Sequence, residues 1–188
     1  DIRDYTSLAE TMTPEETYRF VNAFDGRMGP VITNHHGFVN QYLGDAIMAI
    51  FPNKVEDALQ AAVEMQQVIQ KYNVHRLSKG RKPVAAGIGM HTGSLVMGII
   101  GDQKRMDAAT IADTVNTASR IESLTKYYHC KILLSSVTYD QIEQKDQFQF
   151  RYLGKVQVKG KEKSVGIYEC FDGDTDESKT LKISYAQK

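Results

Sequence analysis

Two acidic residues and one polar pair are the side chains of this sequence best suited to phosphate chemistry. Asp45 lies at a predicted tight turn between two apolar strands, and a second acidic segment begins with Asp1. Asn116 and Arg120 are four residues apart, so a helix would place them on one face. Two carboxylates can hold divalent metal ions, while Asn and Arg can contact a phosphorylated substrate. These residue types together indicate an enzyme that processes nucleotides.

Composition indicates one globular domain without a polyanion or a bilayer as its main partner. Its 188 residues suffice for one hydrophobic core, and 23 basic residues balance 23 acidic ones, which argues against nucleic acid as a partner. Cys130 and Cys170 lack metal-ligand spacing and are expected to be reduced thiols. The sequence has no signal peptide and no apolar run near the ~20 residues that span a bilayer. We therefore expect a cytoplasmic domain, with any membrane anchor outside residues 1–188.

The order of predicted elements favours an α+β fold, in which helices cover one sheet whose hairpins carry the site. A capping box at Thr13–Glu16 begins the first long helix, which ends near Gly37. Its predicted inward stripe is Tyr18, Val21, Phe24, Met28, Val31 and Ile32. The other predicted elements are strands 38–43 and 46–51, a helix 55–72, strands 84–91 and 95–100 joined as a hairpin, a helix 113–127, a strand 131–135, a short helix near 138–142, and paired strands 148–158 and 165–171.

The end of the sequence differs in character from the rest. Residues 172–188 are polar, so we expect a loosely held C-terminal tail after a single domain of residues 1–171.

Five segments, in their order and spacing, carry a resemblance to a known family. They are residues 1–8, 42–49, 87–93, 113–120 and 158–161. Together they resemble the catalytic domain of class III nucleotidyl cyclases, the adenylate and guanylate cyclases, over nearly the whole chain. The resemblance implies a ferredoxin-like βαββαβ core with additional strands and helices. In the family a strand normally precedes the position of Asp1, and this sequence does not include it.

The resemblance implies a metal site and a reaction. The carboxylates of Asp1 and Asp45 and the carbonyl of Ile2 would hold two Mg²⁺ ions per site, for which Mn²⁺ can substitute. One ion would activate the ribose 3′-hydroxyl for attack on the α-phosphate of the same nucleotide. The other would hold the β- and γ-phosphates, which leave as pyrophosphate.

The same resemblance assigns contacts to the nucleotide. Arg120 would stabilise the charge that develops on the α-phosphate, and Asn116 would orient the ribose. The groups expected to contact the other phosphates are the side chains of Lys159 and Arg105 and the backbone amides of Tyr5 and Thr6.

The two positions that select the base depart from both family patterns. Adenylate-type members carry Lys where this chain has Gln41, paired with Thr or Asp where it has Ala109; guanylate-type members carry Glu and a small residue. A Gln amide can pair with either purine, depending on its orientation. We favour ATP because no carboxylate is available at position 41 to hold guanine.

In the family, one protomer supplies the metal carboxylates and the other supplies Asn, Arg and Lys. The chain carries both sets, so we expect a head-to-tail homodimer with two composite sites. The preferred interpretation is an adenylate cyclase that forms 3′,5′-cyclic AMP as the output domain of a signalling protein. The alternatives are a guanylate or base-promiscuous cyclase and, from another class, a catalytically silent module that dimerises for regulation. A diguanylate cyclase or polymerase palm is disfavoured because the sequence has no GGDEF-like turn.

Overall fold

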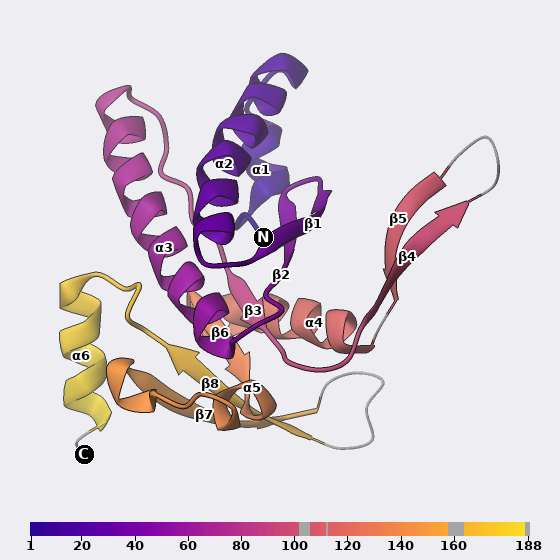
Figure 1. Ribbon diagram of the computed structural model, residues 1–188. Helices are drawn as coiled ribbons and strands as arrows, with labels where there is room; N and C mark the ends of the chain where they lie inside the picture. Colours follow the sequence, from indigo (N-terminus) through magenta and orange to yellow (C-terminus); the bar gives the residue numbers. More distant parts are fainter. Residues whose placement is uncertain (102–105, 112, 158–163, 187–188) are drawn as a thin grey trace.

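The computed structural model describes residues 1–101, 106–111, 113–157 and 164–186, and it is a mixed α+β structure (Figure 1). The elements, in chain order, are α1 (Tyr5–Ala9), α2 (Pro14–Asn34), β1 (Phe38–Leu43), β2 (Ala46–Ile50), α3 (Val55–Ser78), β3 (Ile88–Met90), β4 (Val96–Gly101), β5 (Met106–Ile111), α4 (Asp113–Tyr127), β6 (Ile132–Ser135), α5 (Ser136–Asp140), the 3₁₀ turn η1 (Lys145–Gln147), β7 (Phe150–Val156), β8 (Val165–Cys170) and α6 (Asp176–Ala186). In the described part of the chain, every helix is too short or too polar to cross a membrane.

The N-terminal segment connects two sheets that the strands form separately. The nitrogen of Ile2 donates to the carbonyl of Asp45 (3.2 Å), and that of Arg3 donates to the carbonyl of Ala85 (2.7 Å). Ile2 therefore forms an antiparallel bridge with Ala86 while it also contacts the turn of the β1–β2 hairpin. The extended N-terminal segment is followed in chain order by α2, β1, β2, α3 and β3, which is the predicted βαββαβ order. The remaining elements are additions to this core.

The main sheet has the strand order β3-β6-β8-β7, with β3 and β6 parallel and the other pairs antiparallel. A parallel pair needs a crossover, and α4 supplies it. Close packing of α4 on β3 depends on Gly89, because a Cβ there would lie 2.2 Å from the backbone nitrogen of Glu122. This contact fixes the helix that carries Asn116 and Arg120.

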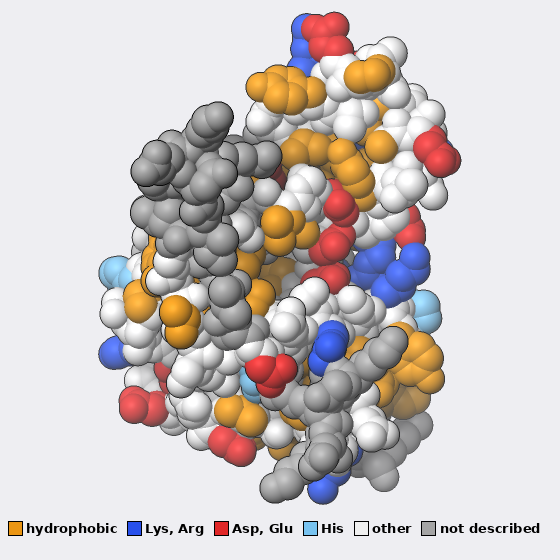
Figure 2. Space-filling model, turned by 90° about the vertical axis from the view of Figure 1, so that its right-hand side faces the viewer, with side chains coloured by type: hydrophobic (Ala, Val, Ile, Leu, Met, Phe, Trp, Pro, Cys, Tyr) orange, Lys and Arg blue, Asp and Glu red, His pale blue; other side chains and the backbone are white. Residues whose placement is uncertain are grey.

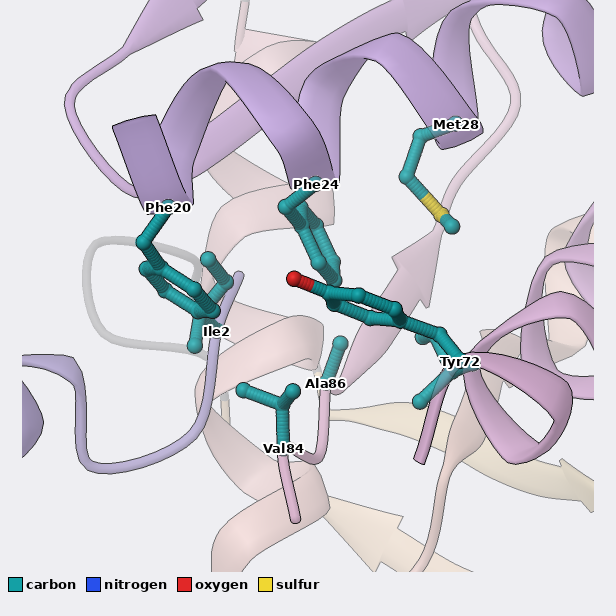
Figure 3. Packing of buried hydrophobic residues seen from close by; sticks show 8 residues of the cluster. Ile2, Phe20, Phe24, Met28, Tyr72, Val84 and Ala86 are labelled. Carbon is teal, nitrogen blue, oxygen red and sulfur yellow. The ribbon is translucent and has the colours of Figure 1, made fainter. Parts of the chain in front are cut away.

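A hydrophobic core lies between α2, α3 and the N-terminal segment. Figure 3 shows Phe20, Phe24 and Met28 of α2 pointing toward Tyr72 of α3, with Ile2 beside them. The predicted capping box is confirmed by hydrogen bonds in both directions between Thr13 and Glu16.

One member of the predicted inward stripe of α2 was assigned to the wrong face. Tyr18 is 70% exposed, whereas Phe20 is buried. Two residues correspond to about 200° around a helix, so the two side chains point in nearly opposite directions. The buried face follows Phe20, Phe24, Met28 and Val31.

The predicted hairpin of strands 84–91 and 95–100 is also wrong. The first strand is shorter, Ile88–Met90, and it pairs with β6, while β4 pairs with the unpredicted strand β5. Strands β4 and β5 form an arm that projects from the body of the molecule (Figure 1). The chain leaves the main sheet after β3. In the loop that follows, the carbonyl of Ser94 accepts a hydrogen bond from the hydroxyl of Thr114 in the first turn of α4 (2.7 Å).

Residues 176–186 form a docked helix rather than the loosely held tail that their polarity suggested. Glu169 of β8 is fully buried and pairs with Arg151 of β7 (2.7 Å) and with Lys182 of α6. Lys182 also contacts the buried Asp174. Burial alone would lower the pKa of Lys182, but the hydrogen bonds to Asp174 and Glu169 outweigh it and raise the pKa. A buried carboxylate needs such partners, and this requirement fixes α6 to the sheet.

Replacing Lys182 by Met should lower the free energy of unfolding by about 3 kcal/mol, because Glu169 would keep only one of its cationic partners. Urea denaturation measures this change. Lys179→Met on the same helix is a matched control, since Lys179 pairs with a fully exposed Asp176 at 4.0 Å and should change stability by less than about 0.5 kcal/mol. Equal effects of the two substitutions would show that the buried pair does not fix α6.

Candidate functional site

Asp1 and Asp45 come together although they are far apart in the sequence. The turn between β1 and β2 depends on Gly44, whose φ of +65° favours glycine, and it directs the chain through Asp45. The hydrogen bond from the nitrogen of Ile2 to the Asp45 carbonyl then holds the segment of Asp1 against this turn. On its other side, the Asp1 carbonyl accepts a hydrogen bond from the Gly87 nitrogen (3.0 Å). Backbone bonds thus hold the segment of Asp1 between the turn of Asp45 and Gly87.

A cavity of about 480 Å³ lies over these two residues. Its lining consists of residues 1–7, Asp45, and Glu122, Ser123 and Lys126 of α4. Tyr5 and Thr6 therefore lie at the same cavity as the acidic pair. Figure 2 shows acidic and basic side chains next to each other near the middle of the face on the side of the β4–β5 arm. A cavity with both signs of charge suits a ligand that combines metal ions with phosphate groups.

The donor atoms at this cavity fit a hard divalent cation. Carboxylate and carbonyl oxygens are the ligands that Mg²⁺ prefers, and it usually keeps water and substrate phosphate oxygens as well. Nowhere in the described residues do three His, Cys, Asp or Glu side chains form a metal-binding cluster. An ion held by Asp1, Asp45 and the Ile2 carbonyl would therefore complete its coordination with water and phosphate oxygens.

Glu122 is a residue of this cavity that sequence reasoning missed. Burial raises the pKa of its carboxyl, and the nearby Asp45 carboxylate raises it further. Its position follows from the packing of α4, since a Cβ on Gly87 would lie 2.9 Å from Glu122 Oε1. In the sequence, Glu122 resembles any acidic residue of an amphipathic helix, so only the helix–strand contact identifies it.

Arg3 connects the metal segment to the end of α4. Its guanidinium donates to the hydroxyl of Thr125 (3.1 Å) and to the carbonyl of Cys130 (3.3 Å). Thr125 is fully buried and Arg3 is half-buried, so this connection lies partly within the packed structure. Arg3 thus fixes the residues beside Asp1 relative to the helix of Asn116 and Arg120.

Asn116 and Arg120 are one turn apart on α4, as predicted, but they do not line the cavity of Asp1 and Asp45. Asn116 is exposed and Arg120 is half-buried. Within the described residues, one chain therefore does not bring the acidic pair and the Asn–Arg pair to one cavity.

The remaining predicted site residues belong to strands and loops. Gln41 lies on β1 opposite Met48, next to an irregularity in the pairing of β1 with β2. Arg105 and Lys159 lie outside the described residues, and so does the side chain of Ala109.

Comparison with known proteins identifies the family. The family described as adenylate and guanylate cyclase catalytic domain matches residues 1–182. An adenylate cyclase of Anabaena cylindrica is 43% identical over 175 residues, which are 90% of this chain and 35% of the relative. The chain thus spans about a third of the length of that curated relative.

Two solved structures have the same fold. The guanylyl cyclase Cya2 superposes with a TM-score of 0.76 at 33% identity, over 90% of this chain and 87% of that one. The adenylyl cyclase CyaB from P. aeruginosa superposes with a TM-score of 0.77 at 28% identity, over 90% and 89%. Domains of this family act on nucleoside triphosphates, generally with divalent metal, and typically dimerise. The order of elements, the positions of the sequence motifs and these similarities agree: the chain belongs to the family of class III adenylate and guanylate cyclase catalytic domains.

Proposed function

We propose that this domain converts ATP to 3′,5′-cyclic AMP and pyrophosphate. The observation that carries the proposal is the pairing of Asp1 and Asp45 at one cavity by the hydrogen bond between the Ile2 nitrogen and the Asp45 carbonyl. The ribose 3′-oxygen attacks the α-phosphorus and loses its proton to solvent. The bond between the α-phosphorus and the pyrophosphate oxygen breaks, and pyrophosphate leaves.

The acidic half of the site holds metal ions and the triphosphate. Asp1, Asp45 and the Ile2 carbonyl provide the oxygen ligands. Two divalent ions bound there would lower the pKa of the ribose 3′-hydroxyl and neutralise the charge of the phosphates. Tyr5 and Thr6 line the same cavity, and their backbone amides are proposed to donate to phosphate oxygens. Arg105 is proposed as a further phosphate contact.

The basic half stabilises the reacting phosphate. The guanidinium of Arg120 can donate two parallel hydrogen bonds to oxygens of the α-phosphate, whose charge increases in the transition state. Asn116, one turn earlier, orients the ribose so that its 3′-oxygen lies in line with the leaving group. Lys159 contacts the triphosphate.

We propose that the two halves meet across a twofold homodimer. The cavity over Asp1 and Asp45 is called the acidic cavity below. The position of Asn116 and Arg120 outside the acidic cavity of their own chain supports this arrangement. A head-to-tail dimer would create two sites, each with Asp1 and Asp45 from one protomer and the Asn–Arg pair from the other.

Specific activity should therefore fall when the protein is diluted below the dissociation constant of the dimer. Turnover and sedimentation, measured over the same range of protein concentration, check this expectation.

ATP is the proposed substrate. The relative from Anabaena cylindrica supports this choice, whereas the guanylyl cyclase Cya2 has the same fold, so the overall similarity does not select the base. Gln41 favours ATP because it lacks the negative charge that would hold the N1–H and amino group of guanine. Incubation of the domain with Mg²⁺ or Mn²⁺ and each of the four nucleoside triphosphates tests the proposal. Cyclic GMP alone would reverse the base assignment, and no product from any nucleotide would favour the silent module.

Replacing Gln41 by Glu should shift the ratio of kcat/KM values for GTP and ATP toward GTP by about tenfold. The new carboxylate can accept hydrogen bonds from guanine, and it leaves adenine with an unfavourable contact. Asn53→Asp, in the exposed loop after β2, introduces the same charge away from the site and should not change the ratio. An unchanged ratio for the Gln41→Glu variant would show that Gln41 does not contact the base.

A further inference from the structure

Lys126 is a cation of the acidic cavity that the proposed mechanism does not use. It lies in the last turn of α4 and lines the cavity together with Asp1, Asp45 and Tyr5. Its Nζ lies 2.6 Å from Oδ1 of Asp4, and the two side chains are 69% and 59% exposed. Lys126 therefore reaches the cavity from α4 while remaining open to solvent.

Asp4, the partner of Lys126, has an unusual conformation. Its φ of 52° lies in the left-handed region, which Asp tolerates better than most residues but which still costs conformational energy. Asp4 is at the N-cap position of α1, yet its side chain makes no capping hydrogen bond. The carboxylate instead accepts a hydrogen bond from Lys126, and this bond lowers the pKa of Asp4.

The two cations of the cavity lining differ in their availability. The guanidinium of Arg3 donates to the hydroxyl of Thr125 and to the carbonyl of Cys130 in a half-buried position. For Lys126, the ion pair with Asp4 accounts for all the polar contacts of its Nζ among the described residues. An exposed pair of this kind contributes little to stability, so its lysine can exchange partners when a stronger anion arrives.

We propose that Lys126 binds the β- or γ-phosphate of a nucleotide in the cavity of its own protomer, where a phosphate oxygen replaces the Asp4 carboxylate. The inference rests on the proposed function and adds a contact from the protomer that supplies Asp1 and Asp45. The long, flexible side chain of lysine suits this exchange, since its ammonium group acts as a mobile point charge. Asp4 keeps that charge at the edge of the cavity before the nucleotide binds. The contact persists on pyrophosphate after the ring closes, because the leaving group carries the same oxygens.

Two kinetic constants, measured on matched variants, test this role. Lys126→Met should raise the KM for the nucleotide and the inhibition constant of pyrophosphate by about tenfold each, the loss typical of one hydrogen bond to a charged group. Lys126→Arg keeps the charge and should stay within about threefold of the wild type. Arg19→Met breaks an exposed ion pair of the same 2.6 Å length on α2 and should leave both constants unchanged. Circular dichroism verifies that each variant is folded.

The double variant Asp4→Asn, Lys126→Met separates a direct contact from an indirect one. If Lys126 binds phosphate, the double variant should be as impaired as Lys126→Met alone. A return to wild-type constants would show that Lys126 only draws Asp4 away from the phosphates, and it would overturn the proposal. Unchanged constants in Lys126→Met would overturn it as well.

Calorimetric titration of Mg²⁺–pyrophosphate into the wild type and Lys126→Met distinguishes this inference from the proposed cyclase activity. Weaker binding to the variant supports the role of Lys126 even if the wild type forms no cyclic nucleotide, which would contradict only the proposed function. Equal binding to both proteins, or none to the wild type, overturns the role of Lys126 whatever the turnover.

Discussion

Replacing Asp45 by Asn should reduce the rate of cyclic-nucleotide formation by about a thousandfold, or about 4 kcal/mol of transition-state stabilisation, because a neutral amide is a poor ligand for Mg²⁺. The fold should be retained. The contact that joins Asp45 to the N-terminal segment uses its backbone carbonyl, which the substitution leaves in place. Turnover at saturating Mg²⁺ and thermal unfolding of the same preparation measure the two expectations.

Asp146→Asn is the matched control for this experiment. Asp146 is an exposed carboxylate in the turn η1 and does not line the cavity, so its loss should leave turnover unchanged. Substantial activity of the Asp45→Asn variant would contradict the metal site, since the mechanism requires both acidic residues. Loss of activity together with a large drop in the unfolding temperature would instead assign Asp45 a structural role.

Mixing two inactive variants, Asp45→Asn and Arg120→Ala, should restore about a quarter of the wild-type activity. Random exchange makes about half of the dimers mixed, and each mixed dimer has one intact site and one doubly defective site. The intact site combines Asp1 and Asp45 of one protomer with Asn116 and Arg120 of the other. Activity measured over a range of mixing ratios should be greatest for the equal mixture.

The control for this experiment mixes Asp45→Asn with Asp1→Asn. Both substitutions affect the same half of the site, so no combination of protomers yields an intact one. The mixture should stay inactive. If the mixture of Asp45→Asn and Arg120→Ala also stays inactive although mixed dimers form, the site is not shared between protomers, and the arrangement proposed for Asn116 and Arg120 is wrong.

The sequence by itself determined the features that depend on neighbouring residues. The helix that begins at Thr13 follows from a capping box, whose two hydrogen bonds join residues three apart. The β1–β2 hairpin follows from two apolar segments around Gly44, which accepts the positive φ of the turn. The α+β class follows from the order of such elements, and the order of the family motifs indicated the cyclase family, which the comparisons confirm.

Only the tertiary structure decided which elements meet. Strand β3 pairs with β6, more than forty residues later, because α4 packs on it at Gly89; no local pattern distinguishes this pairing from the predicted hairpin with β4. The C-terminal helix is held by the buried Glu169, whose need for a cationic partner is invisible in a polar sequence.

The acidic cavity shows the same division. The sequence indicated Asp1 and Asp45, whereas the positions of Glu122 and Lys126 beside them depend on how closely α4 approaches the N-terminal segment. Distances between residues that are remote in the chain result from the packing of whole elements, and a sequence pattern records only one element at a time.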